Sequence, residues 1–202
     1  MTGRSLHTAK AHDTFLTPAW ISRWALDVLG LDRWGLDPCG NPDSPLFDPG
    51  MTERVVLLPE YRDRLRGAAD RVIWGNGLDQ DWSAASSVWL NPPYSELPKA
   101  PWSAKFVEEV RLGVALLPVR TASAWWQDDV DRAAVVTLLR KRVTHHGMKS
   151  GAPFGQALIF VGPDAAASHW ARAAIDLGST SVRGPLESGF RIYRFCDDKK
   201  DQ

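Results

Sequence analysis

The chain alternates short runs of consecutive apolar residues with segments in which apolar residues recur at helical spacing. The apolar runs are residues 35–37, 54–58, 71–74, 87–90, 113–117, 133–139 and 157–161. The helical segments are residues 18–29, 102–110, 122–132 and 165–177. Strands that are apolar throughout are buried on both faces, and their alternation with helices is typical of βαβ units. We therefore predict an α/β fold with a mainly parallel sheet and helices on both faces.

The composition predicts one ordered domain. A chain of 202 residues, 44% of them hydrophobic, is long enough to bury a core without disulfides. The 24 basic residues balance the 24 acidic ones, which excludes bulk disorder and a wholesale basic coat for nucleic acid. No period of 20 to 50 residues repeats, so a solenoid is excluded. We expect a single domain over residues 14–196 between a polar tail (1–13) and a charged tail (197–202).

Neither a membrane span nor a metal site is predicted. The sequence has no run of 18 apolar residues, and residues 1–13 lack the apolar core of a signal peptide, so we expect an intracellular protein with no membrane partner. Cys39 and Cys196 form no CxxC motif, and the five histidines lack metal-ligand spacing. We expect neither a disulfide framework nor a bound metal.

The helix over residues 18–29 has a recognisable start, with Thr17 as the expected N-cap and Pro18 at the first helical position. The chain has ten tryptophans, and core packing is favoured over a stacking platform for most of them. The core-facing set is Trp20, Trp24, Trp74, Trp82 and Trp89. The adjacent pair Trp125 and Trp126 is the exception.

Ligands of parallel sheets bind outside the carboxyl ends of the strands, which selects four segments as the candidate site. They are residues 37–40, 75–77, 91–94 and 118–121. All four follow an apolar run, so we expect them to face one crevice.

The tetrapeptide Asn91-Pro92-Pro93-Tyr94 is the most informative of these segments. Its prolines have no N–H group and fix φ, but their carbonyls remain acceptors. The Asn91 amide oxygen and the Pro92 carbonyl can both accept hydrogen bonds from an exocyclic amine, with the Tyr94 ring stacked on the heterocycle. The alternative is a strand terminator with Tyr94 half buried at its rim. A ligand for SH3 or WW domains fits poorly, because the tetrapeptide itself contains neither PxxP nor PPxY and directly follows an apolar run.

The segment after the first apolar run places a carboxylate, Asp37, just before a single glycine, Gly40. The sequence has neither GxGxxG nor GxxxxGK[ST], so a phosphate cradle is disfavoured. The alternative interpretation is an ordinary Asp-Pro turn.

Six short segments, taken in order, carry a family resemblance. They are residues 17–18 (TP), 36–39 (LDPC), 81–82 (DW), 88–95 (VWLNPPYS), 115–121 (ALLPVRT) and 150–154 (SGAPF). This set resembles the phage DNA N6-adenine methyltransferases of the Dam type over about residues 14–162. The specificity of this resemblance lies in the order and spacing of the six segments. The sequence departs from the usual pattern at Gly40-Asn41, where Ala-Ser is commoner, and in a longer stretch over residues 47–73.

The resemblance implies a Rossmann-like S-adenosylmethionine methyltransferase fold that methylates adenine N6 in DNA by direct in-line transfer to a flipped base. The cofactor is S-adenosylmethionine, the partner is DNA, and the setting is the cytoplasm of a bacterial or phage-infected cell. The implied cofactor residues are Thr17, Pro18, Asp37, Pro38, Cys39, Gly40 and Asn76, with either Asp79 or Asp81 on the cofactor's adenine or ribose. The implied catalytic residues are Asn91, Pro92, Pro93 and Tyr94.

The densest basic cluster is Arg140-Lys141-Arg142, and Arg120 follows a strand at the predicted crevice. We expect these four residues to contact DNA phosphates. The alternative is that this cluster is a solvated strand end, because runs of charged residues usually lie on the protein surface.

Two other functions stay open. An NPPY loop also occurs in enzymes that methylate glutamine side chains of proteins. A catalytically silent DNA-binding module could keep the fold, given the altered loop at Gly40-Asn41. A monomer and a dimer are equally compatible with the sequence.

Overall fold

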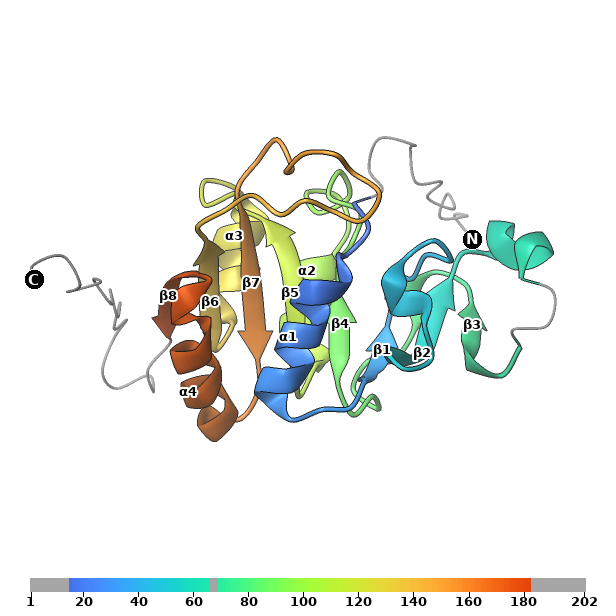
Figure 1. Cartoon of the computed structure of the whole chain (residues 1–202), viewed down its shortest axis with the longest axis horizontal. Coiled ribbons are helices and arrows are strands. Elements are labelled where there is room, and N and C mark those ends of the chain that lie inside the picture. Colours follow the sequence, from blue (N-terminus) through green and yellow to red (C-terminus); the bar gives the residue numbers. More distant parts are fainter. Residues whose placement is uncertain (1–14, 66–68, 183–202) are drawn as a thin grey trace, which may run out of the picture.

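The computed structural model describes residues 15–65 and 69–182. The predicted tails, the domain limits at 14 and 196, and Cys196 lie outside the described residues. Within them one eight-stranded sheet runs through the molecule in the order β3-β2-β1-β4-β5-β7-β6-β8 (Figure 1). The predicted α/β fold class is confirmed.

The sheet has eight strands, and all of them except β8 lie within two residues of a predicted apolar run at each end. They are β1 (Trp34–Asp37), β2 (Thr52–Leu57), β3 (Val72–Trp74), β4 (Val88–Leu90), β5 (Gly113–Pro118), β6 (Val135–Leu139), β7 (Gln156–Val161) and β8 (Gly178–Val182). Strands β1 to β5 pair in parallel, whereas β7 is antiparallel to both β5 and β6. The edge strand β8, antiparallel to β6, was not predicted, because its sequence GSTSV is not an apolar run.

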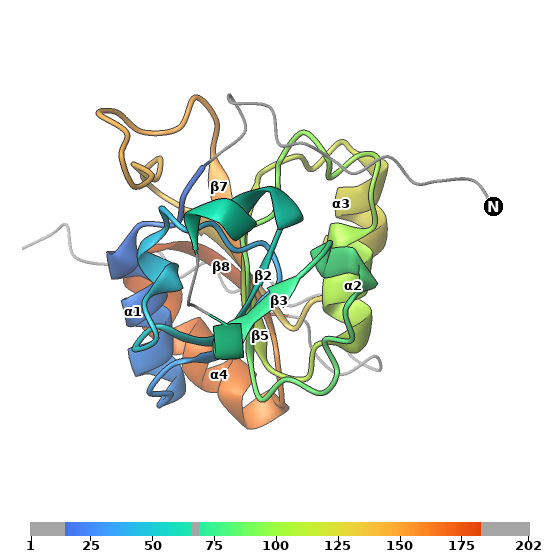
Figure 2. The ribbon, with the colours of Figure 1, turned by 90° about the vertical axis from the view of Figure 1, so that its right-hand side faces the viewer.

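Helices cover both faces of the sheet. Helices α1 (Ala19–Leu29) and α4 (Asp164–Ala173) cover one face, and α2 (Trp102–Glu109) and α3 (Ala124–Asp129) cover the other (Figure 2). The predicted helices 122–132 and 165–177 are each shorter than expected, because both tighten into a 3₁₀ turn at the C-terminal end.

The start of α1 differs from the prediction. Pro18, not Thr17, is the N-cap, and no side chain caps the helix. The Thr17 hydroxyl instead accepts hydrogen bonds from Trp89 Nε1 and Asn91 Nδ2, each at 3.1 Å. Trp20 was wrongly expected in the core: it is 52% exposed, because the buried stripe of α1 runs through Ile21 and Ala25.

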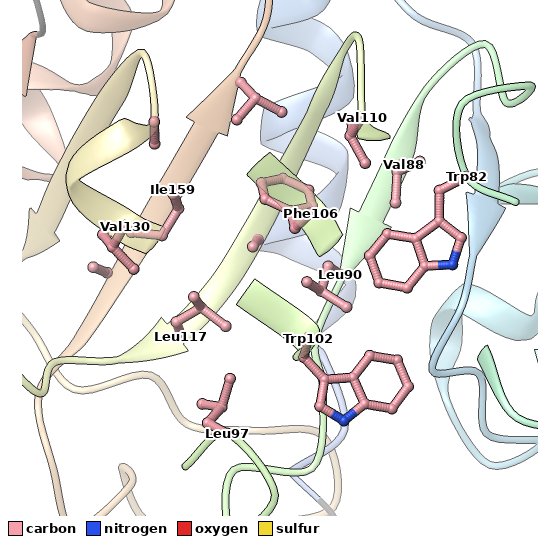
Figure 3. Close-up of a cluster of buried hydrophobic side chains, with 14 of the residues drawn as sticks. Trp82, Val88, Leu90, Leu97, Trp102, Phe106, Val110, Leu117, Val130 and Ile159 are labelled. Carbon is pink, nitrogen blue, oxygen red and sulfur yellow. The ribbon is translucent and has the colours of Figure 1, made fainter. Parts of the chain in front are cut away.

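A hydrophobic layer fills each face of the sheet. On one face, Trp102 and Phe106 of α2 pack with Val88 and Leu90 of β4 (Figure 3). On the other face, α1 and α4 bury a layer that includes Trp34, Trp89 and Trp170. The Trp34 indole donates a hydrogen bond of 2.8 Å to the hydroxyl of Ser22. This bond joins α1 to β1 inside the core.

The strand directions bring several loops to one edge of the sheet. The carboxyl ends of β1 to β5 lie at this edge because these strands are parallel. The long loop 140–155, which joins β6 to β7, crosses above the same edge (Figure 1). The predicted crevice residues therefore share one end of the molecule.

The buried Ser22 to Trp34 bond supplies a test of this packing. Ser22→Ala leaves the fully buried Trp34 N–H without an acceptor, which typically costs about 1–3 kcal/mol. We expect the free energy of unfolding, measured by urea denaturation, to fall by this amount. The matched control is Ser168→Ala, on the exposed side of α4, which should leave stability unchanged or slightly higher. Equal effects of the two substitutions would contradict the role of the Trp34 to Ser22 hydrogen bond in stability.

Candidate active site

One cavity of about 250 Å³ opens where the first four strands end. It is bounded by the segment before α1, by the loops after β1, β2, β3 and β4, and by the start of α2. Its lining residues are Phe15, Leu16, Thr17, Asp37, Pro38, Cys39, Gly40, Asn41, Ser44, Val56, Leu58, Tyr61, Gly75, Asn76, Gly77, Asn91, Pro92, Pro93, Ser95, Glu96, Lys99 and Trp102. The cavity therefore joins three of the four predicted loops.

The Asn91 amide has a defined orientation. Its Nδ2 donates hydrogen bonds to the Phe15 carbonyl and the Thr17 hydroxyl. The Phe15 carbonyl can only accept, so the nitrogen must be the atom that faces it. The buried Oδ1 atom has no hydrogen-bond partner among the described residues. A buried acceptor left without a donor is costly, so an N–H group that reached Oδ1 would be favoured.

Asp37 ends β1 and is buried. Its Oδ1 accepts a hydrogen bond of 2.9 Å from the Cys39 amide. Burial raises the pKa of Asp37 to about 7, and the amide hydrogen bond only partly opposes this. Burial and the neighbouring Asp37 carboxyl also raise the pKa of the Cys39 thiol, which is therefore protonated at neutral pH. The carboxyl can change charge near neutral pH.

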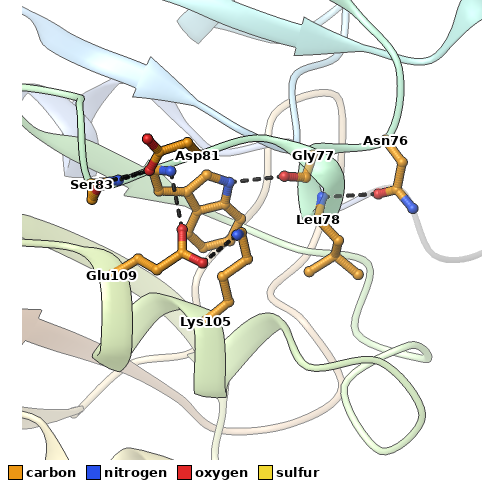
Figure 4. A network of polar contacts seen from close by, with 8 residues as sticks. Asn76, Gly77, Leu78, Asp81, Ser83, Lys105 and Glu109 are labelled. Atoms are coloured by element: carbon orange, nitrogen blue, oxygen red, sulfur yellow. Dashed lines mark hydrogen bonds and ion pairs between the residues drawn. The ribbon is translucent and has the colours of Figure 1, made fainter.

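The loops after β1 and β3 meet without room for a side chain. A Cβ atom at Gly77 would lie 1.9 Å from the Pro38 carbonyl oxygen. The Trp82 indole N–H donates a 2.8 Å hydrogen bond to the Gly77 carbonyl and holds this loop from behind. Glu109 accepts from the Trp82 amide and pairs with Lys105 (Figure 4). The Asn76–Gly77 wall is therefore supported by α2.

Neither Asp79 nor Asp81, the two acidic residues predicted to contact the cofactor, lines the cavity. Asp79 is exposed. Asp81 is also exposed, and its Oδ1 accepts hydrogen bonds from the Ser83 amide and hydroxyl at 2.9 and 2.6 Å (Figure 4). Its carboxylate caps a turn instead of facing a ligand. Asn76, which was also predicted, does line the cavity.

Among the remaining predicted residues, Thr17, Asp37, Pro38, Cys39, Gly40, Asn91, Pro92 and Pro93 line the cavity. Pro18 and Tyr94 are buried and do not line the cavity. The Tyr94 hydroxyl donates to the Leu116 carbonyl at 3.2 Å and accepts from Gln156 Nε2 at 3.1 Å. Its ring, expected to stack on a base, is packed within an aromatic cluster.

A buried network links loop 140–155 to the cavity wall. Gln156 Oε1 accepts from the Val143 amide, so Gln156 Nε2 faces His145 Nε2 at 2.8 Å. His145 Nε2 must then be the acceptor, and Nδ1–H donates to the Leu16 carbonyl at 3.1 Å. Burial lowers the pKa of His145, which favours this neutral form.

Several lining residues were not predicted. Tyr61 lies three residues after the predicted run 54–58, and the rule that selects residues after strands would have found it had it been applied there. Leu58 was counted as the last residue of that run, but β2 ends at Leu57. Phe15 and Leu16 precede the first helix and carry no motif. Their position comes from tertiary hydrogen bonds to Asn91 and His145.

The predicted basic residues lie at the same edge but outside the cavity. Arg140, Lys141 and Arg142 are exposed at the start of loop 140–155. Arg120, after β5, is exposed with its guanidinium 5.8 Å from the Phe154 ring. The stretch 133–163 contains no Asp or Glu.

Residues 15–65 and 69–182 contain neither a metal-binding cluster nor a membrane-spanning helix. In these ranges no three His, Cys, Asp or Glu side chains are grouped so that they could hold a metal ion. No helix there has the length and apolar character needed to cross a bilayer.

The first seven strands follow the order 3-2-1-4-5-7-6, which is typical of the Rossmann-like fold of S-adenosylmethionine-dependent methyltransferases. Within this class, residues 73–160 match the family model of DNA N-6-adenine-methyltransferase (Dam). Over these residues the chain is similar to the Dam family of adenine-specific DNA methyltransferases, whose methyl donor is S-adenosylmethionine. The predicted family and cofactor are thereby confirmed.

Solved structures with a similar fold are remote in sequence. A candidate RNA methyltransferase of Pyrococcus horikoshii has 13% identity and a TM-score of 0.49, covering 70% of this chain and 81% of its own. A dimethyladenosine transferase of Plasmodium falciparum has 11% identity and a TM-score of 0.46, with coverages of 75% and 64%. An RNA methyltransferase of Salinibacter ruber, solved with S-adenosyl-L-homocysteine, has 16% identity and a TM-score of 0.39, with coverages of 73% and 94%. The comparison with curated proteins gave no match.

The raised pKa of Asp37 makes a prediction for stability. Native Asp37 keeps its proton up to about pH 7, whereas the unfolded carboxyl loses it near pH 4. The free energy of unfolding must therefore fall as pH rises between these values, by up to about 1.4 kcal/mol per pH unit. Asp37→Asn should remove this component and keep the acceptor for Cys39.

His145 acts in the opposite direction, because its pKa is lowered and stability from its neutral form is lost as pH falls below about 6.5. The two contributions are separated by comparing wild type with Asp37→Asn at each pH in urea unfolding. The stability difference, wild type minus variant, should decline from pH 4 to 7. A difference independent of pH would contradict the burial of an uncompensated carboxyl.

Proposed function

We propose that the chain transfers a methyl group from S-adenosylmethionine to N6 of an adenine that has been turned out of duplex DNA. The family match supports adenine in DNA as the substrate. The observation that carries the proposal is the buried and unpartnered Oδ1 atom of Asn91, a residue that lines the same cavity as Asp37. The lining of this cavity therefore includes a residue suited to an amine donor and a residue suited to a cationic ligand.

The residues after β1 and β3 fit the cofactor. Asp37 is a buried carboxyl with no ion pair among the described residues, so a positively charged ligand group would compensate it. Cys39, Gly40 and Asn76 would form the neighbouring walls. When bound, S-adenosylmethionine supplies the methyl group on a sulfonium, which leaves as a neutral thioether.

The target amine must be activated, because the N6 lone pair is delocalised into the adenine ring. The Asn91 Oδ1 and Pro92 carbonyl oxygens would accept its hydrogens and stabilise the positive charge that develops on nitrogen. The N6 to carbon bond forms as the carbon to sulfur bond breaks, and one N6 proton then passes to solvent. The neutral leaving group makes a covalent enzyme intermediate unnecessary.

A base within a duplex must leave the stack to enter the cavity, at a cost of a few kcal/mol. Arg120, Arg140, Lys141 and Arg142 are exposed at the edge where the cavity opens. We assign them to contacts with phosphates, which would hold the duplex over the cavity.

The two alternatives give different results in binding experiments. A protein-glutamine methyltransferase would bind the cofactor but leave DNA unmodified, and the family match favours DNA. A silent DNA-binding module would give no heat with S-adenosylmethionine in calorimetry.

Asn91→Ala tests the role of the amide oxygen. Wild-type protein, incubated with labelled S-adenosylmethionine and plasmid DNA from a methylation-deficient strain, should yield N6-methyladenine on nucleoside analysis. Loss of a comparable transition-state contact typically lowers the rate by about 10² to 10³, and we expect this loss in kcat for Asn91→Ala. Cofactor binding, measured by calorimetry, should persist. Wild-type turnover by the variant would refute the role of Asn91.

The basic cluster is tested through salt dependence. Replacing Arg140, Lys141 and Arg142 by alanine should weaken DNA binding and reduce the slope of log K against log salt by about 2 to 3. The control replaces Arg33, Arg111 and Arg132, which are exposed and precede β1, β5 and β6 at the opposite edge. Its slope should match wild type. If both triple variants shift the slope equally, the cluster has no specific role in DNA binding.

A further inference from the structure

Gln156, the first residue of β7, follows loop 140–155 and is only 1% exposed. Its Oε1 atom accepts a hydrogen bond of 3.2 Å from the Val143 amide of that loop. Its Nε2 atom has two hydrogens, one directed to His145 Nε2 at 2.8 Å and the other to the Tyr94 hydroxyl at 3.1 Å. The donors of this amide are therefore fully used, and they are divided between loop 140–155 and Tyr94.

On the side of the loop, these hydrogen bonds lead to the basic cluster. Val143 directly follows Arg140, Lys141 and Arg142 in the chain. The three basic side chains are exposed, whereas Val143 and His145 are buried. The contacts with Gln156 therefore hold the loop directly after the residues that we assign to DNA phosphates.

On the other side, the hydrogen bonds of Gln156 lead to the loop after β4. The Tyr94 hydroxyl donates its single hydrogen to the Leu116 carbonyl of β5 at 3.2 Å and accepts from Gln156. The two bonds fix the end of the segment 91–94, in which Asn91 Oδ1 is the proposed acceptor for the target amine. A displacement of about 1 Å in a reacting geometry can lower a rate by about 10²-fold.

The same two loops are also joined through backbone carbonyls. The Phe15 carbonyl accepts from Asn91 Nδ2, and the Leu16 carbonyl accepts from His145 Nδ1 at 3.1 Å. Loop 140–155 and the segment 91–94 are thus connected through two consecutive residues of the chain as well as through Gln156. Of these connections, the one through Gln156 runs through a side chain that can be replaced.

We propose that Gln156 is a positioning residue that couples loop 140–155 to the loop after β4, so that contact of the basic cluster with DNA also determines where Asn91 lies. This rests on the proposed function, because it takes DNA as the partner of the cluster and Asn91 as the catalytic residue. Hydrogen bonds in a buried network depend on one another, so a shift at one end changes the geometry at the other.

Gln156→Met tests this coupling, because methionine fills a similar space without hydrogen bonds. Binding of a labelled DNA duplex, measured by fluorescence anisotropy, should weaken by about 2- to 150-fold, the range of couplings within one hydrogen-bond network. The slope of log K against log salt should stay as in wild type, since every charge is kept. We expect kcat to fall by up to about 10²-fold. Cofactor binding by calorimetry should be unchanged, because Gln156 does not line the cavity.

A double-mutant cycle measures the coupling itself. Tyr94→Phe, which keeps the ring and removes the hydroxyl, is combined with alanine at Arg140, Lys141 and Arg142. With Gln156 present, the two effects on kcat/KM should depart from additivity by about 2- to 150-fold. In the Gln156→Met background the same two changes should be additive.

Ser22→Ala is the matched control, because it also removes a buried hydrogen bond but does so between α1 and β1. It should lower stability and leave DNA binding and kcat as in wild type. This separates the loss of coupling from a general loss of stability.

Three outcomes would overturn the proposal. They are unchanged DNA binding and kcat in Gln156→Met, a cofactor affinity that falls as far as the DNA affinity, and additive effects in the cycle with Gln156 present. The last of these decides the matter even if Gln156→Met does not fold. A wild-type protein that binds DNA and cofactor but transfers no methyl group would instead refute the proposed function, and the anisotropy comparison would still show whether Gln156 acts on DNA binding.

Discussion

The arrangement of the site depends on how one amide is turned. Asn91 follows β4, and its amide could be turned in either of two ways. The Phe15 carbonyl can only accept a hydrogen bond, so the amide nitrogen faces this carbonyl. Oδ1 is left without a partner among the described residues. The contact joins residues 76 positions apart, so it exists only once the segment before α1 has docked on the sheet. Folding thereby produces the acceptor that an amine substrate needs.

Burial shifts the pKa values of Asp37 and His145 in opposite directions, and both shifts favour the neutral form of the side chain. The Asp37 carboxyl is pushed toward neutrality and the His145 imidazole is kept neutral. The first shift leaves a carboxyl that a cationic ligand can ionise. The second leaves one hydrogen-bond pattern for His145, in which Gln156 donates to it and Leu16 accepts from it.

Much of the fold was predictable because it follows from local pattern. The fully apolar runs are buried strands, and the interruptions after Asp37, Leu90 and Pro118 place polar residues at one edge. Strand β8 was missed because its residues are small and polar, so its pairing with β6 leaves no apolar signal. Trp20 was misplaced because helical spacing alone does not say which stripe of α1 faces the sheet.

The site was predictable where it lies on loops that follow strands, and was not where tertiary contacts decide. Asp37 and Asn91 line the cavity as expected. Tyr94, Asp79 and Asp81 do not, because a buried hydroxyl network holds the first, while Asp81 caps a turn and Asp79 is exposed. Phe15 enters the site through backbone hydrogen bonds that no motif records.

The antiparallel direction of β7 determines which loop can accept insertions most easily. Because β7 runs against β5 and β6, loop 140–155 leaves and re-enters the sheet at the same edge, where Leu138 pairs with Ala157. Only buried anchors such as Val143 and His145 tie it down. Insertions within the exposed residues 146–150 would lengthen an exposed arch without altering strand register, and the entropy of loop closure grows only slowly with length. Relatives with other DNA preferences are therefore expected to differ first in this arch.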